Sequence, residues 1–331
     1  MKKTLVALAV MVAAGSAQAI ELYNQDGVSV DLSGDVEVRY IKKTDENANT
    51  TQQIDDADFG FDTRYQINDE YQIGAFFEFS GDNNDRATGN SSVGNVYVAL
   101  YTQTYGDLKV GKLDTIIDDA GVGSDFAFGV KSFFDDAPTG GEEAVRYDYD
   151  NGAFYLGLGL IQDKYNTDDK RIGKDGNYLD AKVGYRINDL DLTAYYATAD
   201  LRGKKKNDAG TQDVLNTDAT IFAFEAVYAG IENLNLELGY YSTDEEHLGT
   251  VVTREETDTV ALAADYTWNE ITFAAGYSTT DFEASDAKDA NHWFGNVAYS
   301  VAPNTKLYAE VGGNNADKSE TGYAVGIQAK F

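Results

Sequence analysis

Side-chain polarity alternates with a period of two residues along most of this 331-residue chain. Between Val28 and Tyr40 the even positions are apolar or small, and the odd positions are polar or charged. Because successive side chains of a β-strand point to opposite faces of a sheet, the pattern predicts strands with one apolar and one charged face. Helical spacing does not fit these segments, and the alternation recurs at 59–67, 71–79, 180–187, 260–268, 271–277 and 323–331.

The connections between the alternating segments are short and long in turn. Seven are short and contain Asn, Asp or Gly, which tolerate the left-handed backbone angles of tight hairpins. These lie at 68–69, 105–106, 151–152, 188–189, 230–233, 269–270 and 302–304. Eight are long and polar, at 43–57, 80–93, 113–143, 162–177, 200–220, 242–258, 279–291 and 313–321. Fifteen connections predict about sixteen antiparallel strands.

A soluble sheet protein and a transmembrane barrel would both alternate in this way. Three features favour the barrel: short and long connections are segregated, charges recur on nearly every polar face, and aromatic residues lie near strand ends. These aromatic residues are Tyr40, Tyr65, Tyr71, Tyr266, Trp268 and Trp293. Closure is compulsory in lipid because every backbone polar group needs a partner. The predicted fold class is all-β, a 16-stranded antiparallel transmembrane β-barrel.

Composition removes several classes of function. The chain has 56 acidic and 26 basic residues, a formal net charge of 26 − 56 = −30, and no cysteine. Phosphate binding needs clustered Lys and Arg, so we expect no nucleic-acid partner. The lack of Cys excludes disulfides and thiol catalysis. With 23 Tyr and 16 Phe, the chain is too aromatic for a disordered acidic protein.

The N-terminal segment predicts a secretory signal peptide. Residues 2–3 are lysines, an apolar run covers 5–14, and residues 17–19 match the small-x-small cleavage pattern. The apolar run is too short to cross a membrane as a helix. We therefore expect residues 1–19 to be removed on export and residues 20–331 to form the barrel.

The longest connection, Leu113–Glu143, is the main candidate for a functional segment. Sixteen strands enclose an aqueous channel rather than a packed core, and a structureless insert of roughly thirty residues is usually functional. Its phenylalanines are interspersed with acids, namely Asp114, Asp118, Asp119, Asp125, Asp135 and Asp136. Two placements remain open from the residues alone: an exposed acidic loop, or a loop folded into the lumen with its aromatic residues on the wall.

Specific motifs occur near the start of the mature chain and around this connection. They are the stretch Ile20–Gly34, the hexapeptide Asp107–Lys112 and, within the connection, Asp119, Asp125 and Phe128-Gly129. Together they resemble the general diffusion porins of Gram-negative bacteria. The terminal Phe331 is similar to the aromatic residue that the outer-membrane assembly machinery recognises in this family.

The resemblance implies the architecture and the surroundings of the chain. It implies a homotrimer of sixteen-stranded barrels in the outer membrane, with short periplasmic turns, long external loops and an inward-folded third loop that forms the constriction. The implied surroundings are outer-membrane lipid and lipopolysaccharide. The barrels would pass small hydrophilic solutes and ions by passive diffusion, and no cofactor is expected.

These porins commonly place a ladder of basic residues on the wall that faces the third loop. In an ungapped alignment the ladder positions hold Asp35, Asp58, Asn95 and a residue near Glu142, so the positive side is depleted here. Basic candidates for the pore wall remain at Arg39, Arg64, Lys109 and Arg146. A slip of one or two residues would let Arg64 or Arg146 restore the ladder, because sequence fixes register weakly.

The charge pattern predicts cation selectivity. Acids expected on the pore wall are Asp31, Asp35, Glu37, Asp58 and Asp62. Rings of acids attract cations and repel anions, and low-dielectric walls focus the field. Neutralising Asp125 should therefore lower the cation preference, whereas neutralising a distal loop acid such as Asp208 should matter little.

Two other functions remain open, a surface adhesin or receptor and an outer-membrane hydrolase. The only histidines, His247 and His292, fall in predicted loops and have no recognisable nucleophile motif, so we expect no catalytic residue. Acidic pairs such as Asp55-Asp56 and Asp168-Asp169 match no dedicated calcium loop, so we expect no metal site.

Overall fold

The computed structural model describes residues 19–81, 92–131, 139–164, 171–206, 212–249, 252–283 and 288–331. The predicted signal peptide thus lies, except for Ala19, outside the described residues. No helix in the described part of the chain is long and apolar enough to cross a membrane. The elements are a 3-10 helix, η1 (Ile117–Asp119), and the strands β1 (Ile20–Gln25), β2 (Val28–Lys42), β3 (Thr51–Gln66), β4 (Tyr71–Ser80), β5 (Ser92–Thr102), β6 (Asp107–Asp114), β7 (Gly140–Asp150), β8 (Phe154–Ile161), β9 (Asn177–Ile187), β10 (Leu190–Leu201), β11 (Lys204–Lys206), β12 (Gln212–Val214), β13 (Thr217–Ile231), β14 (Leu234–His247), β15 (Thr253–Trp268), β16 (Ile271–Phe282), β17 (Ala290–Ala302), β18 (Thr305–Asn314) and β19 (Gly322–Lys330).

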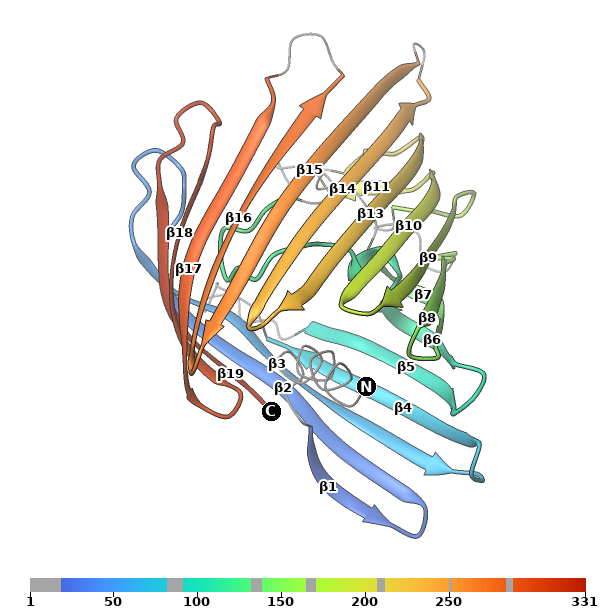
Figure 1. Cartoon of the computed structure of the whole chain (residues 1–331). Coiled ribbons are helices and arrows are strands. Elements are labelled where there is room, and N and C mark those ends of the chain that lie inside the picture. The colour runs from blue at the N-terminus through green and yellow to red at the C-terminus, as the bar shows by residue number, and fades with distance from the viewer. Residues whose placement is uncertain are drawn as a thin grey trace.

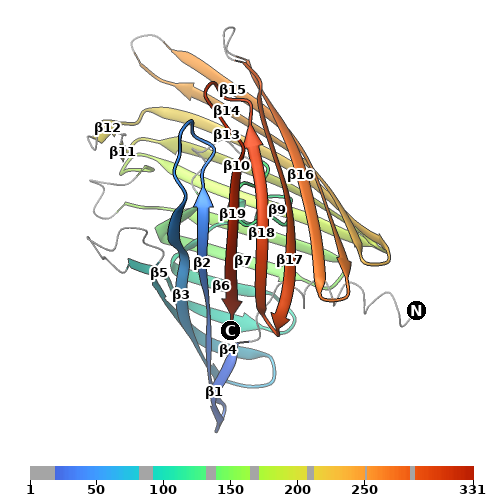
Figure 2. The ribbon, with the colours of Figure 1, turned by 90° about the vertical axis from the view of Figure 1, so that its left-hand side faces the viewer.

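Sixteen of the described strands close into one antiparallel barrel (Figures 1 and 2). β2 to β10 follow one another in chain order, β13 to β19 continue the sheet, and β19 pairs with β2. The C-terminal residue extends this seam, because Phe331 and Gly34 exchange two backbone hydrogen bonds of 2.8 Å. The predicted 16-stranded antiparallel barrel is confirmed.

The structure contains two small hairpins that the period-two alternation did not predict. β1 turns into β2 at Asp26 and Gly27, both of which have positive φ, and it pairs with the first residues of β2. β19 pairs with β2 as far as Asp35, and β1 pairs with the same edge of β2 from Leu32 onward. β1 therefore covers the part of this edge that β19 does not reach. The other hairpin joins β11 and β12, of three residues each, which are too short for a pattern to reveal.

Tight turns join the strands at one end of the barrel, where the sequence predicts them. Asn188, Asn233, Asn269 and Asn304 adopt φ of 52°, 63°, 53° and 57° in four of these turns. Asn tolerates this left-handed region because its short polar side chain bonds locally to the backbone. The seven predicted short turns are confirmed.

The long-loop end differs from the prediction in the strand boundaries. β3 begins at Thr51 and β14 runs to His247, so the predicted loops 43–57 and 242–258 are too long. Beyond the apolar, lipid-facing zone of the barrel, both faces of a strand are polar. The alternation of side-chain polarity therefore ends there, although the strands remain paired. Arg254 and Asp244, for example, form a 2.6 Å ion pair across β14 and β15. The loop assignment of both histidines is wrong for the same reason: His247 ends β14 and His292 lies in β17.

The outer and inner faces of the wall differ sharply in polarity. Outward side chains such as Val98, Leu262 and Ile327 are exposed apolar groups, as lipid contact requires. Of the six aromatic residues expected near strand ends, Tyr71 is half-buried and the other five are exposed. The inward face carries the charged residues and the third loop.

Candidate functional site

Loop 3, residues 115–139 between β6 and β7, folds into the barrel (Figure 1). It is described at residues 115–131 and 139. Ile116 and Ile117 are buried against the inner wall, 0% and 1% exposed. The inward placement is therefore confirmed over the described part of the loop. Of the predicted loop acids, Asp114 ends β6, Asp118, Asp119 and Asp125 lie on loop 3, and Asp135 and Asp136 lie outside the described residues.

The root of loop 3 is held by ion pairs to two wall strands. Asp119 Oδ2 lies 2.5 Å from Arg146 Nη2 on β7 and 2.5 Å from Lys182 Nζ on β9. Arg146 also donates to the Thr115 carbonyl oxygen at 2.8 Å. Partial burial would raise the pKa of Asp119, but its two cations outweigh that effect and hold the pKa below its usual range. Asp119 therefore stays charged well into the acid range.

Carboxylates of the wall accept backbone amides of the loop one after another. Ile117 N–H donates to Asp180 on β9 at 2.9 Å. Further along, Gly121 N–H donates to Glu225 on β13 at 2.6 Å, and Gly123 N–H donates to Glu237 on β14 at 2.7 Å. These bonds to carboxyl oxygens satisfy amides that have no strand partner, and they hold the loop along the wall.

Glu310 on β18 is the strongest of these anchors. Its carboxylate accepts three consecutive amides, from Phe126, Ala127 and Phe128, at 2.7, 2.8 and 2.7 Å. The residue is 2% exposed, so the three donors replace the water that a buried carboxylate needs. The Phe126 ring stacks on Tyr308, with centroids 3.9 Å apart, beside the same anchor.

Small wall residues make room for the loop. Ala197, Ala223 and Ala261 on β10, β13 and β15 are each 0% exposed and belong to the cluster that contains the loop isoleucines. Farther along, Phe128 fills the space over Gly312 and Gly322, where an added Cβ would lie 2.3 Å and 2.4 Å from Phe128 atoms. The lumenal wall is thus shaped to the loop.

Two loop carboxylates combine access to the lumen with a raised pKa. Burial among neighbouring protein atoms, followed by the charges of Asp114 and Asp119, raises the pKa of Asp118 to about 6. Burial and the charge of Glu310 raise the pKa of Asp125 to about 6. The side chains remain partly exposed to the lumen. Their charge therefore changes within the mildly acidic range.

Each predicted basic residue of the pore wall has an acidic partner. Arg39 pairs with Asp55 and also donates to the Phe126 carbonyl at 2.9 Å. The remaining pairs are Arg64 with Asp62 at 2.6 Å, Lys109 with Asp148 at 3.7 Å, and Arg146 with Asp148 at 2.9 Å besides Asp119. The positive charges on this wall are thus largely compensated locally.

The predicted wall acids form facing pairs on β2 and β3. The register places Asp31 opposite Asp62, Asp35 opposite Asp58, and Glu37 opposite Asp56. Glu37 is 4% exposed and accepts bonds from Tyr308 and Gln328, whereas the two other β2 acids are only partly buried. In the described part of the chain, no ion pair reaches Asp35, Asp56, Asp58 or the nearby Glu78 of β4.

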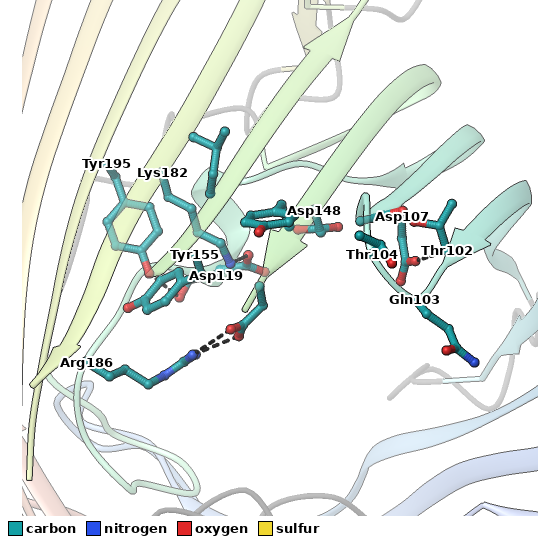
Figure 3. Close-up of a pocket in the computed structure, with 14 residues that line it drawn as sticks. Thr102, Gln103, Thr104, Asp107, Asp119, Asp148, Tyr155, Lys182, Arg186 and Tyr195 are labelled. Carbon is teal, nitrogen blue, oxygen red and sulfur yellow. Dashed lines mark hydrogen bonds and ion pairs between the residues drawn. The ribbon is translucent and has the colours of Figure 1, made fainter. Parts of the chain in front are cut away.

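A polar cavity of about 440 Å³ lies beside the root of loop 3, toward the short-turn end (Figure 3). It is lined by the β5–β6 turn, by β7 to β10 and by Asp119. Sequence analysis missed two of its residues as site residues, Lys182 and Arg186. Both are inward positions of an alternating strand, and that alternation was the signal available for finding them.

The other functional residues missed from sequence are the loop anchors Asp180, Glu225, Glu237 and Glu310. Alternation indicates that they face inward, but nothing local distinguishes an anchor from a free lumenal acid.

The histidine region and the acid pairs complete the predicted candidates. His247 Nδ1 lies 2.9 Å from Thr217 Oγ1, and its Nε2 lies 3.8 Å from both Glu245 and Glu255. Within the described ranges, no group of three or more His, Cys, Asp and Glu residues is arranged to hold a metal ion. The Asp168-Asp169 pair lies outside those ranges.

Known proteins match this chain over nearly its whole length. A profile of the Gram-negative porins matches residues 4–319. Porin-like protein H of Photobacterium profundum is 33% identical over 336 residues, covering 100% of both chains. The Monosaccharide porin of Halomonas sp is 26% identical over 332 residues, covering 95% of this chain and 81% of that protein.

Solved porins have the same fold. A loop L8 deletion mutant of OmpT, an outer membrane protein of Vibrio cholerae, gives a TM-score of 0.77 at 20% identity, covering 92% of this chain and 100% of that one. The anion-selective porin from Comamonas acidovorans gives 0.72 at 18% identity, covering 92% and 100%. The profile match over residues 4–319 and the full-length match to the 33% identical relative show that this chain, a β-barrel of the outer membrane, belongs to the Gram-negative porin family.

Proposed function

We propose that this porin is a passive, cation-selective diffusion channel for small hydrophilic solutes and ions. The three facing acid pairs of β2 and β3 carry the proposal. Like charges directly opposite each other destabilise a sheet, so their repetition on the lumenal face is explained best by an electrostatic role in the pore. A row of acids on a low-dielectric wall concentrates cations and repels anions.

A shared barrel fold does not determine whether a porin prefers cations or anions. The Comamonas acidovorans neighbour is described as anion-selective, and it has the same barrel at 18% identity. The sign must therefore follow from the residues that line each pore. Here the four predicted bases of the pore wall are paired with acids, and the acids of β2 to β4 outnumber the bases of those strands, which supports cations. The Halomonas relative described as a monosaccharide porin supports small hydrophilic solutes as the other cargo.

Assembly and export belong to the same proposal. The protein would be exported with residues 1–19 as a cleaved signal peptide and would form a homotrimer embedded in lipid and lipopolysaccharide. A trimer form of Vibrio cholerae OmpT, with a TM-score of 0.73, supports the trimer. Phe331 would be read by the outer-membrane assembly machinery, and deleting it should lower the amount of protein in the outer membrane without changing its synthesis.

Conductance in a planar bilayer tests the proposal directly. The purified full chain, after export, should give stable single-channel steps, and its reversal potential in a KCl gradient should have the sign of a K⁺ preference. A reversal potential of the opposite sign would contradict the cation selectivity. Complete absence of conductance in correctly folded protein would instead favour the adhesin or receptor alternative.

A further inference from the structure

The tip of loop 3, residues 124–128, contacts strands on both sides of the seam at which the barrel closes. This seam is the pairing of β19 with β2, and the strands β18, β19 and β2 lie side by side in Figure 2. β19 has nine residues whereas β15 has sixteen, so the seam is paired over a short length. Closing it joins opposite ends of the chain, which costs more conformational entropy than closing a hairpin.

On the C-terminal side of the seam, the tip is bound to β17 and β18. Glu310 of β18 accepts three consecutive amides of the tip, and the Phe126 ring stacks on Tyr308 of the same strand. Asn296 of β17 donates to the Ser124 carbonyl oxygen at 2.8 Å and to Glu310 at 3.0 Å. These contacts fix the tip to the last strands of the barrel.

On the N-terminal side of the seam, the tip is bound to β2. Arg39 of β2 donates from Nη1 to the Phe126 carbonyl oxygen at 2.9 Å. Glu37 of the same strand accepts the Tyr308 hydroxyl from β18, and it accepts the Gln328 side chain from β19 at 2.8 Å. A single loop residue, Phe126, therefore connects β18 with β2 beside a polar network that crosses the seam.

An apolar cluster covers the seam from the lumenal side. Ile41 of β2 and Ala324 of β19 are paired in register and are 2% and 1% exposed. They belong to one cluster with Phe126 and Phe128 of the tip. Phe128 also covers Gly322 of β19, where an added Cβ would lie 2.4 Å from the Phe128 ring. The tip therefore packs on both strands of the seam.

These contacts depend on the closed barrel. Phe126 lies 87 residues from Arg39 and 184 residues from Glu310 in the sequence. Both partners reach the tip only when β18 and β2 lie on either side of β19, which is their order in the closed sheet. Docking of the tip and closure of the seam therefore stabilise each other.

We propose that the tip of loop 3 has a second function, which is to hold the closing seam of the barrel together. Loop 3 docks and the barrel closes in one cooperative step, and the seam opens only when the tip undocks. This function goes beyond the proposed channel function, because it concerns assembly and unfolding of the barrel rather than passage of solutes.

Unfolding rates measured with and without a covalent bond across the seam test this function. The chain has no cysteine, so Val36→Cys with Ala329→Cys, at positions that face each other on β2 and β19, introduces one cross-link on oxidation. Ala264→Cys with Ala275→Cys is the matched cross-link, between β15 and β16. Circular dichroism follows the unfolding of the purified, exported chain in denaturant.

Two variants weaken the tip from opposite sides. Glu310→Ala should raise the unfolding rate at least about tenfold, because three hydrogen bonds of the tip are lost. Phe126→Ala keeps Glu310 and changes only the loop, and it should raise the rate about tenfold by removing the stack on Tyr308. With the seam cross-linked, both should unfold at the rate of their cross-linked parent. With β15 and β16 cross-linked, the increase should remain.

Glu225→Ala is the matched control. This buried carboxylate of β13 also holds loop 3, through the Gly121 amide, but β13 lies away from the seam. Its contact persists while the seam opens, so the unfolding rate should change by less than about twofold. An equally large increase in this variant would show that any loosening of loop 3 speeds unfolding, and would overturn the specific function of the tip.

Two further results would overturn the proposal. One is an increased rate in Glu310→Ala and Phe126→Ala that persists after the seam is cross-linked. The other is an unchanged rate in both variants without a cross-link. Neither result depends on conductance, so failure of this inference is distinguishable from failure of the channel function.

Discussion

Asp35 on β2 lies directly opposite Asp58 on β3, and both side chains belong to the lumenal face. Neither forms an ion pair with a basic residue in the described ranges. In a sheet with a purely structural role, this pairing would lower the stability of the fold and bring no functional advantage. On the lumenal wall of a channel, the same pair places two carboxylates beside the path of ions.

Neutralising this pair should change ion selectivity. Asp35→Asn together with Asp58→Asn should move the reversal potential in a KCl gradient toward zero, with each single variant intermediate. The double variant should also be more stable by about 0.2–1 kcal/mol, because a like-charge cross-strand pair is removed. Asp317→Asn is the control, since that side chain is 88% exposed and lies in an outer loop. An unchanged reversal potential in the double variant would exclude the pair as a determinant.

Selectivity should depend on pH through loop 3. Asp118 and Asp125 have pKa values raised to about 6, so both lose their charge as the pH falls from about 7.5 to 5. Cation preference should therefore decrease over this window but not vanish, because the facing acid pairs of β2 and β3 lie outside loop 3. Reversal potentials measured at several pH values check this. Asp125→Asn should lower the preference at pH 7.5 and reduce its pH dependence.

The same carboxyls should affect stability with a defined sign. Their folded-state pKa values lie above those of the unfolded chain, so the folded protein binds more protons between about pH 4 and 6. Their contribution favours folding at the acid end of this window and is lost as the pH rises through about 6. Asp119 acts in the opposite direction and stabilises the fold above its unfolded pKa. Denaturation midpoints of Asp118→Asn and Asp119→Asn across pH should shift with opposite slopes.

Loosening the Glu310 anchor should make the channel noisier. Each hydrogen bond to a charged group contributes about 1.5–3 kcal/mol, and Glu310→Ala removes three of them from adjacent loop amides. Glu310→Gln retains one acceptor oxygen and should have a smaller effect. Open-channel current noise is the measurement, and Glu320→Gln, an outer-loop residue paired with Lys42, is the control. A quiet channel in Glu310→Ala would show that the other wall anchors suffice.

Adding a side chain at Gly312, which lies beneath Phe128, should push loop 3 away from the barrel wall. A Cβ at Gly312 would lie 2.3 Å from Phe128 Cβ, which cannot move without the loop backbone. Gly312→Ala should therefore destabilise the fold by about 1–3 kcal/mol, as overpacking does, and should alter single-channel conductance. Gly295→Ala on the neighbouring strand is matched, because the nearest atom there is 4.0 Å away. Equal behaviour of the two variants would mean that Phe128 relocates freely.

The barrel itself was determined by local sequence. Alternation such as that of Val28–Tyr40 is a property of the extended backbone, and turns such as Asn188-Asp189 carry their own conformational preference. Strand ends were less determined, as the early start of β3 at Thr51 shows, because polarity no longer alternates beyond the apolar belt. Sequence therefore specified the sixteen barrel strands and the lumenal face of the predicted wall charges, although it did not reveal β1, β11 and β12.

Only the tertiary structure decided what the inward charges do. Asp119 pairs with a lysine 63 residues away, and Phe126 donates to a glutamate 184 residues away. Such contacts depend on closure of the whole barrel and on the path of loop 3 across it, neither of which leaves a periodic signal. Glu310 and Asp35 therefore look alike in the sequence, as acids on inward positions. Glu310 is a buried anchor because amides of loop 3 reach it. Asp35 instead faces Asp58 on the lumenal wall.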